Sequence, residues 1–311
     1  MSPSFHHQAR NLLQSVLLIG GMALIAWVVI GTVAGPGTTL LMVASSVLGL
    51  LLAPSLPKTL LLSAYRARRL TGRDFPQGVG ILAELARRAD LPRVPALYYV
   101  PSALPNAFAL GDPRDSVICV TDGLLRLLDS RELAGVLAHE VAHVANRDLW
   151  IMGVADVLTR AVSLASWIGQ FILVLNLPLL LSGAAHVPWH IPLLLVFSPT
   201  LMALLQLALS RTREFDADRG AVDLTGDAEG LASALLKLDR RVGRFWEEMF
   251  LPGRRIPEPS LLRTHPPTAE RVRRLRALSG PRRPVPDGAP VRVPGGDRIA
   301  PPRFGPWGIY R

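Results

Sequence analysis

The chain has 311 residues, half of them apolar, with a mean hydropathy of +0.31 and a formal net charge of +10. A soluble globular protein rarely combines these values unless apolar and charged residues are segregated, and here long uncharged runs alternate with Arg-rich stretches. The single cysteine, Cys119, excludes an intramolecular disulfide and a thiolate metal cluster. The composition therefore indicates a membrane protein with basic faces.

Two apolar runs open the chain, at residues 12–33 and 38–53, and the turn signal Gly-Pro-Gly at 35–37 separates them. A membrane-spanning helix needs about 20 apolar residues, so the first run is long enough and the second is slightly short. We therefore predict a transmembrane hairpin over residues 1–56. A secretory signal peptide is the alternative for the first run, but no clear cleavage site follows it.

Residues 57–160 carry the patterns of a small mixed α/β module. Apolar residues recur at helical spacing over 78–89, and Pro and Gly turn signals separate β-like runs at 96–100, 107–110 and 116–120. A further helix is expected to begin with Ser130 as its N-cap.

That helix contains the run His139-Glu140-Val141-Ala142-His143. Residues four apart share one face of a helix, so the two imidazoles can bind a single ion. Glu140 projects from nearly the same face, where it can act as general base toward water and then as proton donor to a leaving amine. Two unrelated helix-surface histidines are the alternative interpretation.

Two more apolar runs, at 161–182 and 191–209, predict a second transmembrane hairpin over 161–210. The alternative is a hydrophobic core hairpin in a soluble protein. Lys and Arg flank the predicted spans but are missing from both short hairpin loops, and basic loops stay on the cytoplasmic side. Both termini and the segments 57–160 and 211–311 are therefore expected in the cytoplasm.

A site built on His139 and His143 needs a third protein ligand. No further histidine follows His143 after a short Gly-containing spacer, so a Glu on a second helix is the remaining pattern. Glu214 lies just after the fourth predicted span, on the same predicted side of the membrane. Asp218 follows one helical turn later and can orient a metal-bound imidazole through its free N–H. Alone, Glu214 would be interpreted as a surface carboxylate.

Four stretches, in this order, resemble the HtpX-like membrane zinc metallopeptidases, which are relatives of the CAAX prenyl proteases. They are PNAFALG at 105–111, LAHEVAH with NRD at 137–148, REFDAD at 213–218 and THPPTAER at 264–271. The resemblance covers about residues 8–278. It implies that His139, His143 and Glu214 bind one Zn²⁺ ion, that Glu140 is the catalytic base, and that Asp218 contacts a ligand without binding the ion itself.

The resemblance also implies a substrate-binding edge strand, formed by Asn106, Ala107, Phe108 and Ala109 and ending at Leu110. Such a strand offers unpaired backbone groups to any extended polypeptide. The alternative is a turn that enters a core strand. His265 would be catalytic as a donor to the oxyanion or would approach the zinc at rest. Its alternative role is helix entry before Pro266.

The predicted fold is a mainly α membrane protein, with four transmembrane helices and a cytoplasmic zincin-like α/β peptidase domain that contains a small sheet. A basic, Pro- and Gly-rich tail at 281–311 is expected to be disordered. The predicted function is a zinc endopeptidase of the cell membrane that cleaves membrane or misfolded polypeptides in protein quality control. Its partners are polypeptides and the lipid bilayer, not nucleic acid. A CAAX-type endopeptidase and a non-catalytic scaffold that binds unfolded segments are the alternatives.

Overall fold

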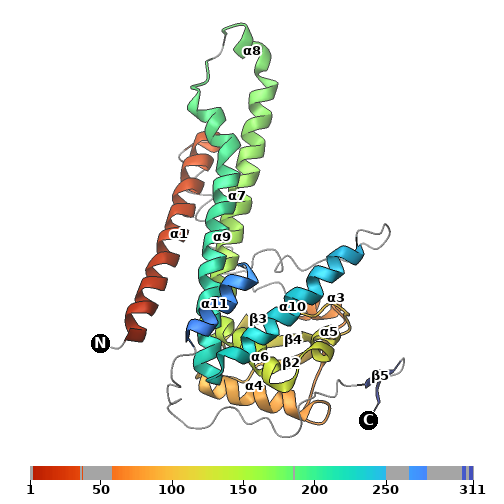
Figure 1. Ribbon diagram of the computed structural model, residues 1–311. Coiled ribbons are helices and arrows are strands. Elements are labelled where there is room, and N and C mark those ends of the chain that lie inside the picture. The colour runs from red at the N-terminus through yellow and green to blue at the C-terminus, as the bar shows by residue number, and fades with distance from the viewer. Residues whose placement is uncertain are drawn as a thin grey trace. The chain divides into compact units, whose positions relative to one another are not determined.

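The computed structural model describes residues 3–35, 37, 58–184, 186–249, 266–278, 303–305 and 308–310 (Figure 1). The chain divides into two structural units, each assembled from segments that are distant in the sequence. The apolar unit contains Met1–Pro54 and Trp150–Thr212, and the α/β unit contains Ser55–Leu149 and Arg213–Arg311. The division after Leu149 lies earlier than the predicted boundary after residue 160.

The apolar unit is built from long helices (Figure 1), and buried side chains of these helices form one cluster. They are α1 (Pro3–Ala34), α7 (Asp148–Leu175) and α9 (His190–Thr225), and the short helix α8 (Leu177–Leu181) follows α7. Three stretches are long and apolar enough to cross a membrane, namely Leu13–Ala34, Asp148–Leu175 and His190–Thr225. The second predicted span, 38–53, lies outside the described residues.

The later helices differ from the sequence prediction at their ends. The third span begins at Asp148 rather than at residue 161, and it ends at Leu175 because Asn176 and Pro178 start the short helix α8. The fourth continues past residue 209 into charged sequence, and Pro199 lies inside it without ending it. Both α7 and α9 therefore contribute residues to both units.

Polar contacts and apolar exposure in the apolar unit both suit a lipid environment. Ser166 and Ser198 form a buried hydrogen bond at 3.0 Å between α7 and α9, and Gln170 donates to the carbonyl of Leu195 at 3.0 Å. By contrast, Trp167 is 75% exposed. Polar side chains that pair across helices while apolar ones face outward are typical of membrane helices.

The α/β unit contains a four-stranded sheet in the order β1-β2-β4-β3. Its strands are β1 (Arg68–Arg69), β2 (Ala96–Val100), β3 (Ala107–Asp112) and β4 (Asp115–Thr121). The parallel pair β2 and β4 is central, β3 pairs antiparallel with β4, and β1 pairs antiparallel with β2. The three longer strands confirm the predicted β-like runs.

Helix α6 (Ser130–Ala145) is the central helix of this unit, because it contacts the sheet and two other helices. Asp129, not Ser130, is its N-cap: the Asp129 side chain accepts from the Glu132 N–H, and Glu132 accepts from the Asp129 N–H. The prediction was wrong by one residue because the reciprocal capping box needs a carboxylate three residues after the cap.

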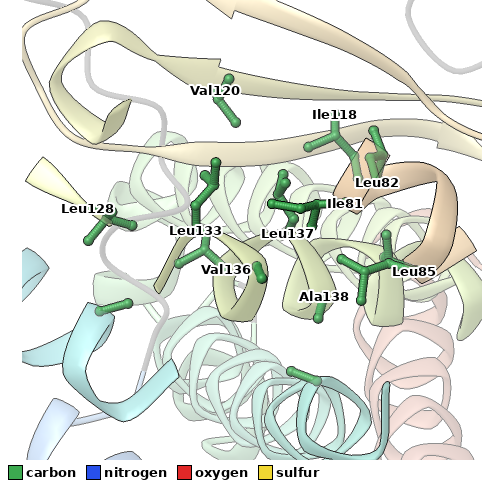
Figure 2. Packing of buried hydrophobic residues seen from close by; sticks show 14 of the residues in the cluster. Ile81, Leu82, Leu85, Ile118, Val120, Leu128, Leu133, Val136, Leu137 and Ala138 are labelled. Atoms are coloured by element: carbon green, nitrogen blue, oxygen red, sulfur yellow. The ribbon is translucent and has the colours of Figure 1, made fainter. Parts of the chain in front are cut away.

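The helices α4 (Pro76–Arg88), α5 (Asp122–Leu127), α10 (Ala228–Met249) and α11 (Thr268–Leu278) complete the core. The short α3 (Lys58–Ala64) has no buried residue. Figure 2 shows apolar side chains of β4, α6 and α4 packed together; among them are Ile118, Leu133, Leu137, Leu82 and Leu85. Each such buried side chain contributes roughly 1.5–3 kcal/mol. The core therefore holds α6 rigidly.

Gly135 allows α10 to approach α6 one turn before the first histidine of the motif. A Cβ atom at Gly135 would lie 2.9 Å from the Leu231 nitrogen and 3.0 Å from the Leu231 Cα. The Gly135→Ala variant is therefore expected to lose about 1–3 kcal/mol of unfolding free energy through overpacking, although alanine favours a helix. Gly80→Ala is the matched control, since a Cβ atom on this exposed residue of α4 meets nothing within 4 Å.

Thermal melting of the detergent-solubilised variants measures both effects. Gly80→Ala is expected to be neutral or to stabilise by up to about 1 kcal/mol, as its helix propensity alone dictates. Equal melting temperatures for the two variants would show that α6 and α10 are not held at this close distance.

The tail departs from the predicted disorder at its end. The strands β5 (Arg303–Gly305) and β6 (Gly308–Tyr310) pair antiparallel, with Phe304 opposite Ile309. Aromatic and β-branched residues favour strands, and the two segments are only two residues apart, as in a hairpin. The remainder of 281–311 lies outside the described residues.

Candidate metal centre

His139 and His143 lie one turn apart on α6 and present their Nε2 atoms to each other at 3.1 Å. Their rings meet edge to face, with an interplanar angle of 84°. His139 is buried and His143 is half-buried. The helical spacing thus places two nitrogen atoms at a single point in the α/β unit.

Glu214, on the part of α9 that belongs to the α/β unit, directs its carboxylate at the same point. Its Oε2 lies 3.5 Å from His139 Nε2, and its Oε1 lies 3.6 Å from His143 Nε2. The structure therefore brings together three predicted ligands from two helices, with their ligand atoms within 4.8 Å of one another.

The chemistry of these donors fits a divalent metal ion. A tetrahedral zinc ion with bonds of 2.0–2.1 Å separates its ligand atoms by about 3.3 Å. The two Nε2 atoms are 3.1 Å apart, and each lies 3.5 or 3.6 Å from a different oxygen of the Glu214 carboxylate. His143 Nδ1 lies 2.8 Å from Asp148 Oδ2, so in the neutral ring Nδ1 carries the hydrogen and Nε2 keeps its lone pair. Lone pairs and a carboxylate that converge in this way are stabilised by a cation.

The two histidines have raised pKa values because carboxylates surround them. Burial lowers the pKa of His143, but hydrogen bonds with Asp148 and Glu214 outweigh burial and raise it to about 10. For His139, burial and the neighbouring His143 lower the pKa, and Asp218 and Glu214 raise it above its usual value. A cation that binds here must displace these protons, so its affinity increases with pH.

Glu140 lies between the two histidines in sequence and is more exposed than its buried neighbours His139 and Val141. Its charge helps to raise the pKa of His143, which places the carboxylate near the convergent donors. Burial and, secondarily, the Glu140 charge raise the pKa of Cys119 to about 12. The thiol is therefore protonated at neutral pH and unsuited to act as a nucleophile.

Asp218 lies on α9 behind His139, with its Oδ1 at 3.1 Å from His139 Nδ1. The contact has the distance of an ion pair but lacks the alignment of a hydrogen bond. Asp148 makes the corresponding contact with His143, in full hydrogen-bond geometry. Each histidine of the motif thus faces one aspartate with its Nδ1.

The predicted substrate strand is the last strand in the sheet order, and within the described part of the chain it pairs only with β4. Its first residue is fixed by Thr121: the Asn106 N–H donates to Thr121 Oγ1 at 2.8 Å, and the Thr121 N–H donates to the Asn106 carbonyl at 3.0 Å. Ala107 and Ala109 pack against the cluster that contains α6, whereas Phe108 packs against Tyr65. His265 lies outside the described residues.

Three charged residues around this centre, Asp148, Arg213 and Arg271, had no predicted role. Arg213 and Arg271 are buried, and each forms an ion pair with an aspartate that faces a histidine of the motif. All three residues lie within the four stretches that resemble the HtpX-like family, and this was the one sequence signal that could have pointed to them. No spacing rule connects them, because Arg271 comes from α11, 128 or more residues after the histidines.

A family model and curated relatives both match this chain. Residues 77–279 match the model of peptidase family M48. The chain is 36% identical over 303 residues to a Protease HtpX homolog of Kineococcus radiotolerans, covering 89% of this chain and all of the relative. It is 35% identical over 282 residues to a Protease HtpX homolog of Pelotomaculum thermopropionicum, covering 86% of this chain and 99% of the relative. The crystal structure of Ste24p from S. mikatae aligns with 19% identity and a TM-score of 0.43, covering 87% of this chain and 66% of that one.

Proposed function

The chain belongs to peptidase family M48 and is a membrane-embedded metalloprotease, and we propose that its metal is one Zn²⁺ ion held by His139, His143 and Glu214. The observation that carries this proposal is the convergence of two Nε2 atoms and one carboxylate at separations of 3.1–3.6 Å. Two imidazoles and one glutamate form a known catalytic zinc ligand set that leaves a coordination position open.

In the proposed reaction, Glu140 handles the protons of peptide-bond hydrolysis. The bound ion would polarise the scissile carbonyl and supply hydroxide near neutral pH. The Glu140 carboxylate takes a proton from the attacking water and delivers it to the nitrogen of the leaving amine. Its half-buried position supports this role, because the carboxylate must be reached by water and by substrate. We keep His265 as a proposed donor to the oxyanion.

We further propose that an extended substrate adds to the sheet along β3, at Asn106 to Ala109. The support is the terminal position of β3 in the sheet and the two hydrogen bonds by which Thr121 holds Asn106. Backbone pairing gives affinity with little sequence preference, so it suits unfolded polypeptides. Membrane and misfolded proteins are accordingly the proposed clients, and quality control is the proposed role.

The test of this function compares three substrates with the purified, detergent-solubilised protein and Zn²⁺. Unfolded casein is expected to be cleaved, cleavage is expected to stop when a chelator removes the metal, and added Zn²⁺ is expected to restore it. Cleavage confined to a prenylated CAAX peptide would favour the CAAX-type alternative. Binding of casein without cleavage, independent of Zn²⁺, would favour the scaffold. A tightly folded protein is the negative control, since it offers no extended segment.

For the location, we propose four spans, with 38–53 as the second, and an α/β unit on the cytoplasmic face of the cell membrane. The support is the three candidate spans and the basic residues that flank them. In a Cys119→Ser background, single cysteines replace two exposed residues, Arg93 of the α/β unit and His186 between α8 and α9. A membrane-impermeant maleimide is expected to label position 186 in intact cells and position 93 only after permeabilisation. The reverse pattern would invert the topology.

A further inference from the structure

Each histidine of the motif contacts an aspartate through its Nδ1 atom, and each of these aspartates forms an ion pair with a buried arginine. His143 Nδ1 lies 2.8 Å from Asp148 Oδ2, and the other oxygen of Asp148 lies 3.3 Å from Arg213 Nη1. Arg213 is also paired with Asp216 on its own helix. The arrangement forms a chain of three side chains that ends on His143.

The same arrangement recurs behind His139. Asp218 Oδ1 lies 3.1 Å from His139 Nδ1, and Arg271 donates to both oxygens of Asp218, at 2.8 Å from Nε and 2.6 Å from Nη2. Arg271 reaches two predicted ligands directly as well: its Nη1 lies 3.2 Å from Glu214 Oε2, and its Nη2 lies 3.5 Å from His139 Nε2. A single guanidinium thus joins Asp218, Glu214 and His139.

Stability alone does not account for this arrangement. Burying a guanidinium requires desolvation, and buried ion pairs often contribute no more stability than apolar residues of the same volume. Arg271 is delivered by α11, which otherwise buries only Val272 and Leu275. Partners that orient the imidazoles and carboxylates of a metal site are, by contrast, a general requirement for ligand geometry and metal affinity.

We propose that Arg213 and Arg271 are positioning residues of the metal centre. Arg213 acts through Asp148 on the ring of His143, and Arg271 acts through Asp218 on His139 and directly on the carboxylate of Glu214. This inference rests on the metal centre proposed above. It adds α11 to the elements that build the centre, because Arg271 is the residue by which α11 reaches the ligands.

The two arginines differ in a way that makes the proposal specific. Arg213 contacts Asp148 through one nitrogen and Asp216 through another, so its link to Asp148 is a single contact, which a lysine ammonium can replace. Arg271 makes a bidentate contact with Asp218 and a separate contact with Glu214, and a point charge cannot reproduce this planar fork. Lysine should therefore substitute for Arg213 and fail at Arg271.

The test measures Zn²⁺ affinity of the full-length protein in detergent by competition with a chromophoric chelator. Arg271→Met and Arg271→Lys are both expected to weaken Zn²⁺ binding by about 10–100-fold, and Arg213→Met by about 10-fold. Arg213→Lys is expected to retain affinity close to that of the unmodified protein. The absorption spectrum of Co²⁺-loaded protein, which reports ligand geometry, is expected to change in Arg271→Lys and not in Arg213→Lys.

Arg276→Met is the matched control. Arg276 lies on the same helix and makes a bidentate contact with Glu229, at 3.2 and 2.9 Å, but that carboxylate does not face a ligand. This variant removes a contact that holds α11 in place without touching the metal centre. If Arg271 acts on the ligands, and not only by holding α11, the Zn²⁺ affinity of Arg276→Met is expected to be unchanged. If Arg276→Met weakens Zn²⁺ binding as much as Arg271→Met does, the positioning role is overturned.

A double-mutant cycle tests whether each arginine acts through its aspartate. In an Asp218→Asn background, Arg271→Lys is expected to weaken binding less than it does alone, and additive losses would contradict the coupling. If Arg213→Lys and Arg271→Lys both bind Zn²⁺ as tightly as the unmodified protein, the positioning role is overturned, while the proposed metal centre stands. An unmodified protein that binds no Zn²⁺ would overturn both.

Discussion

Replacement of Glu140 by Gln is expected to abolish peptide-bond cleavage and to leave the fold and metal binding intact. Glutamine matches the shape of glutamate, but its amide cannot take a proton from water or return it to the leaving amine. General acid–base catalysis of this kind contributes about 10²–10⁴-fold to the rate. The measurement is kcat/KM on casein, together with the Zn²⁺ content of the purified variant.

Glu84→Gln is the matched control for this substitution. Glu84 lies on α4 of the same unit, where hydrogen bonds from Arg87 and Arg88 lower its pKa to about 2. The variant neutralises a carboxylate that pairs with arginines on its own helix, so casein cleavage is expected to continue at the normal rate. If Glu140→Gln cleaves casein as fast as Glu84→Gln, the proposed proton transfer is wrong.

The second large effect is expected at Glu214, where Gln should remove most of the metal affinity and with it the activity. A neutral amide oxygen replaces an anionic ligand, and the buried Arg271 guanidinium, 3.2 Å from Oε2, loses a charged partner. The loss of affinity should exceed the roughly 10–100-fold that is typical of partners behind the ligands. Metal analysis after dialysis, alongside kcat/KM, measures both consequences.

Asp223→Asn is the control on the same helix. Its carboxylate is exposed and lies 4.0 Å from Arg219, so its neutralisation should change neither metal content nor activity. Full Zn²⁺ occupancy in Glu214→Gln would contradict the proposed ligand set.

Features that depend on local spacing were predictable. The two histidines of the motif share a helix face because 3.6 residues make one turn, and the structure places their Nε2 atoms 3.1 Å apart. The runs at 96–100, 107–110 and 116–120 form strands as expected. The N-cap was misplaced by one residue, since Ser130 and Asp129 both suit that position and only the reciprocal bond with Glu132 separates them.

The candidate spans show how far composition alone reaches. Apolar length correctly indicated helices at residues 12–33 and 191–209, but not that α7 begins at Asp148 or that α9 continues to Thr225. Hydropathy reports the environment of side chains. It does not report where a helix ends when charged sequence continues the same backbone hydrogen bonds.

The sequence by itself determined which groups could form the proposed centre: two imidazoles and the carboxylate of Glu140 on one turn of helix, and the carboxylate of Glu214 on another helix. Only the tertiary structure decided which distant charges surround them. Arg213 reaches the centre from α9 and Arg271 from α11, and β3 lies at one edge of the four-stranded sheet. The physical reason is that helical periodicity is a local property, whereas contacts between residues 50 to 130 positions apart depend on how the core packs.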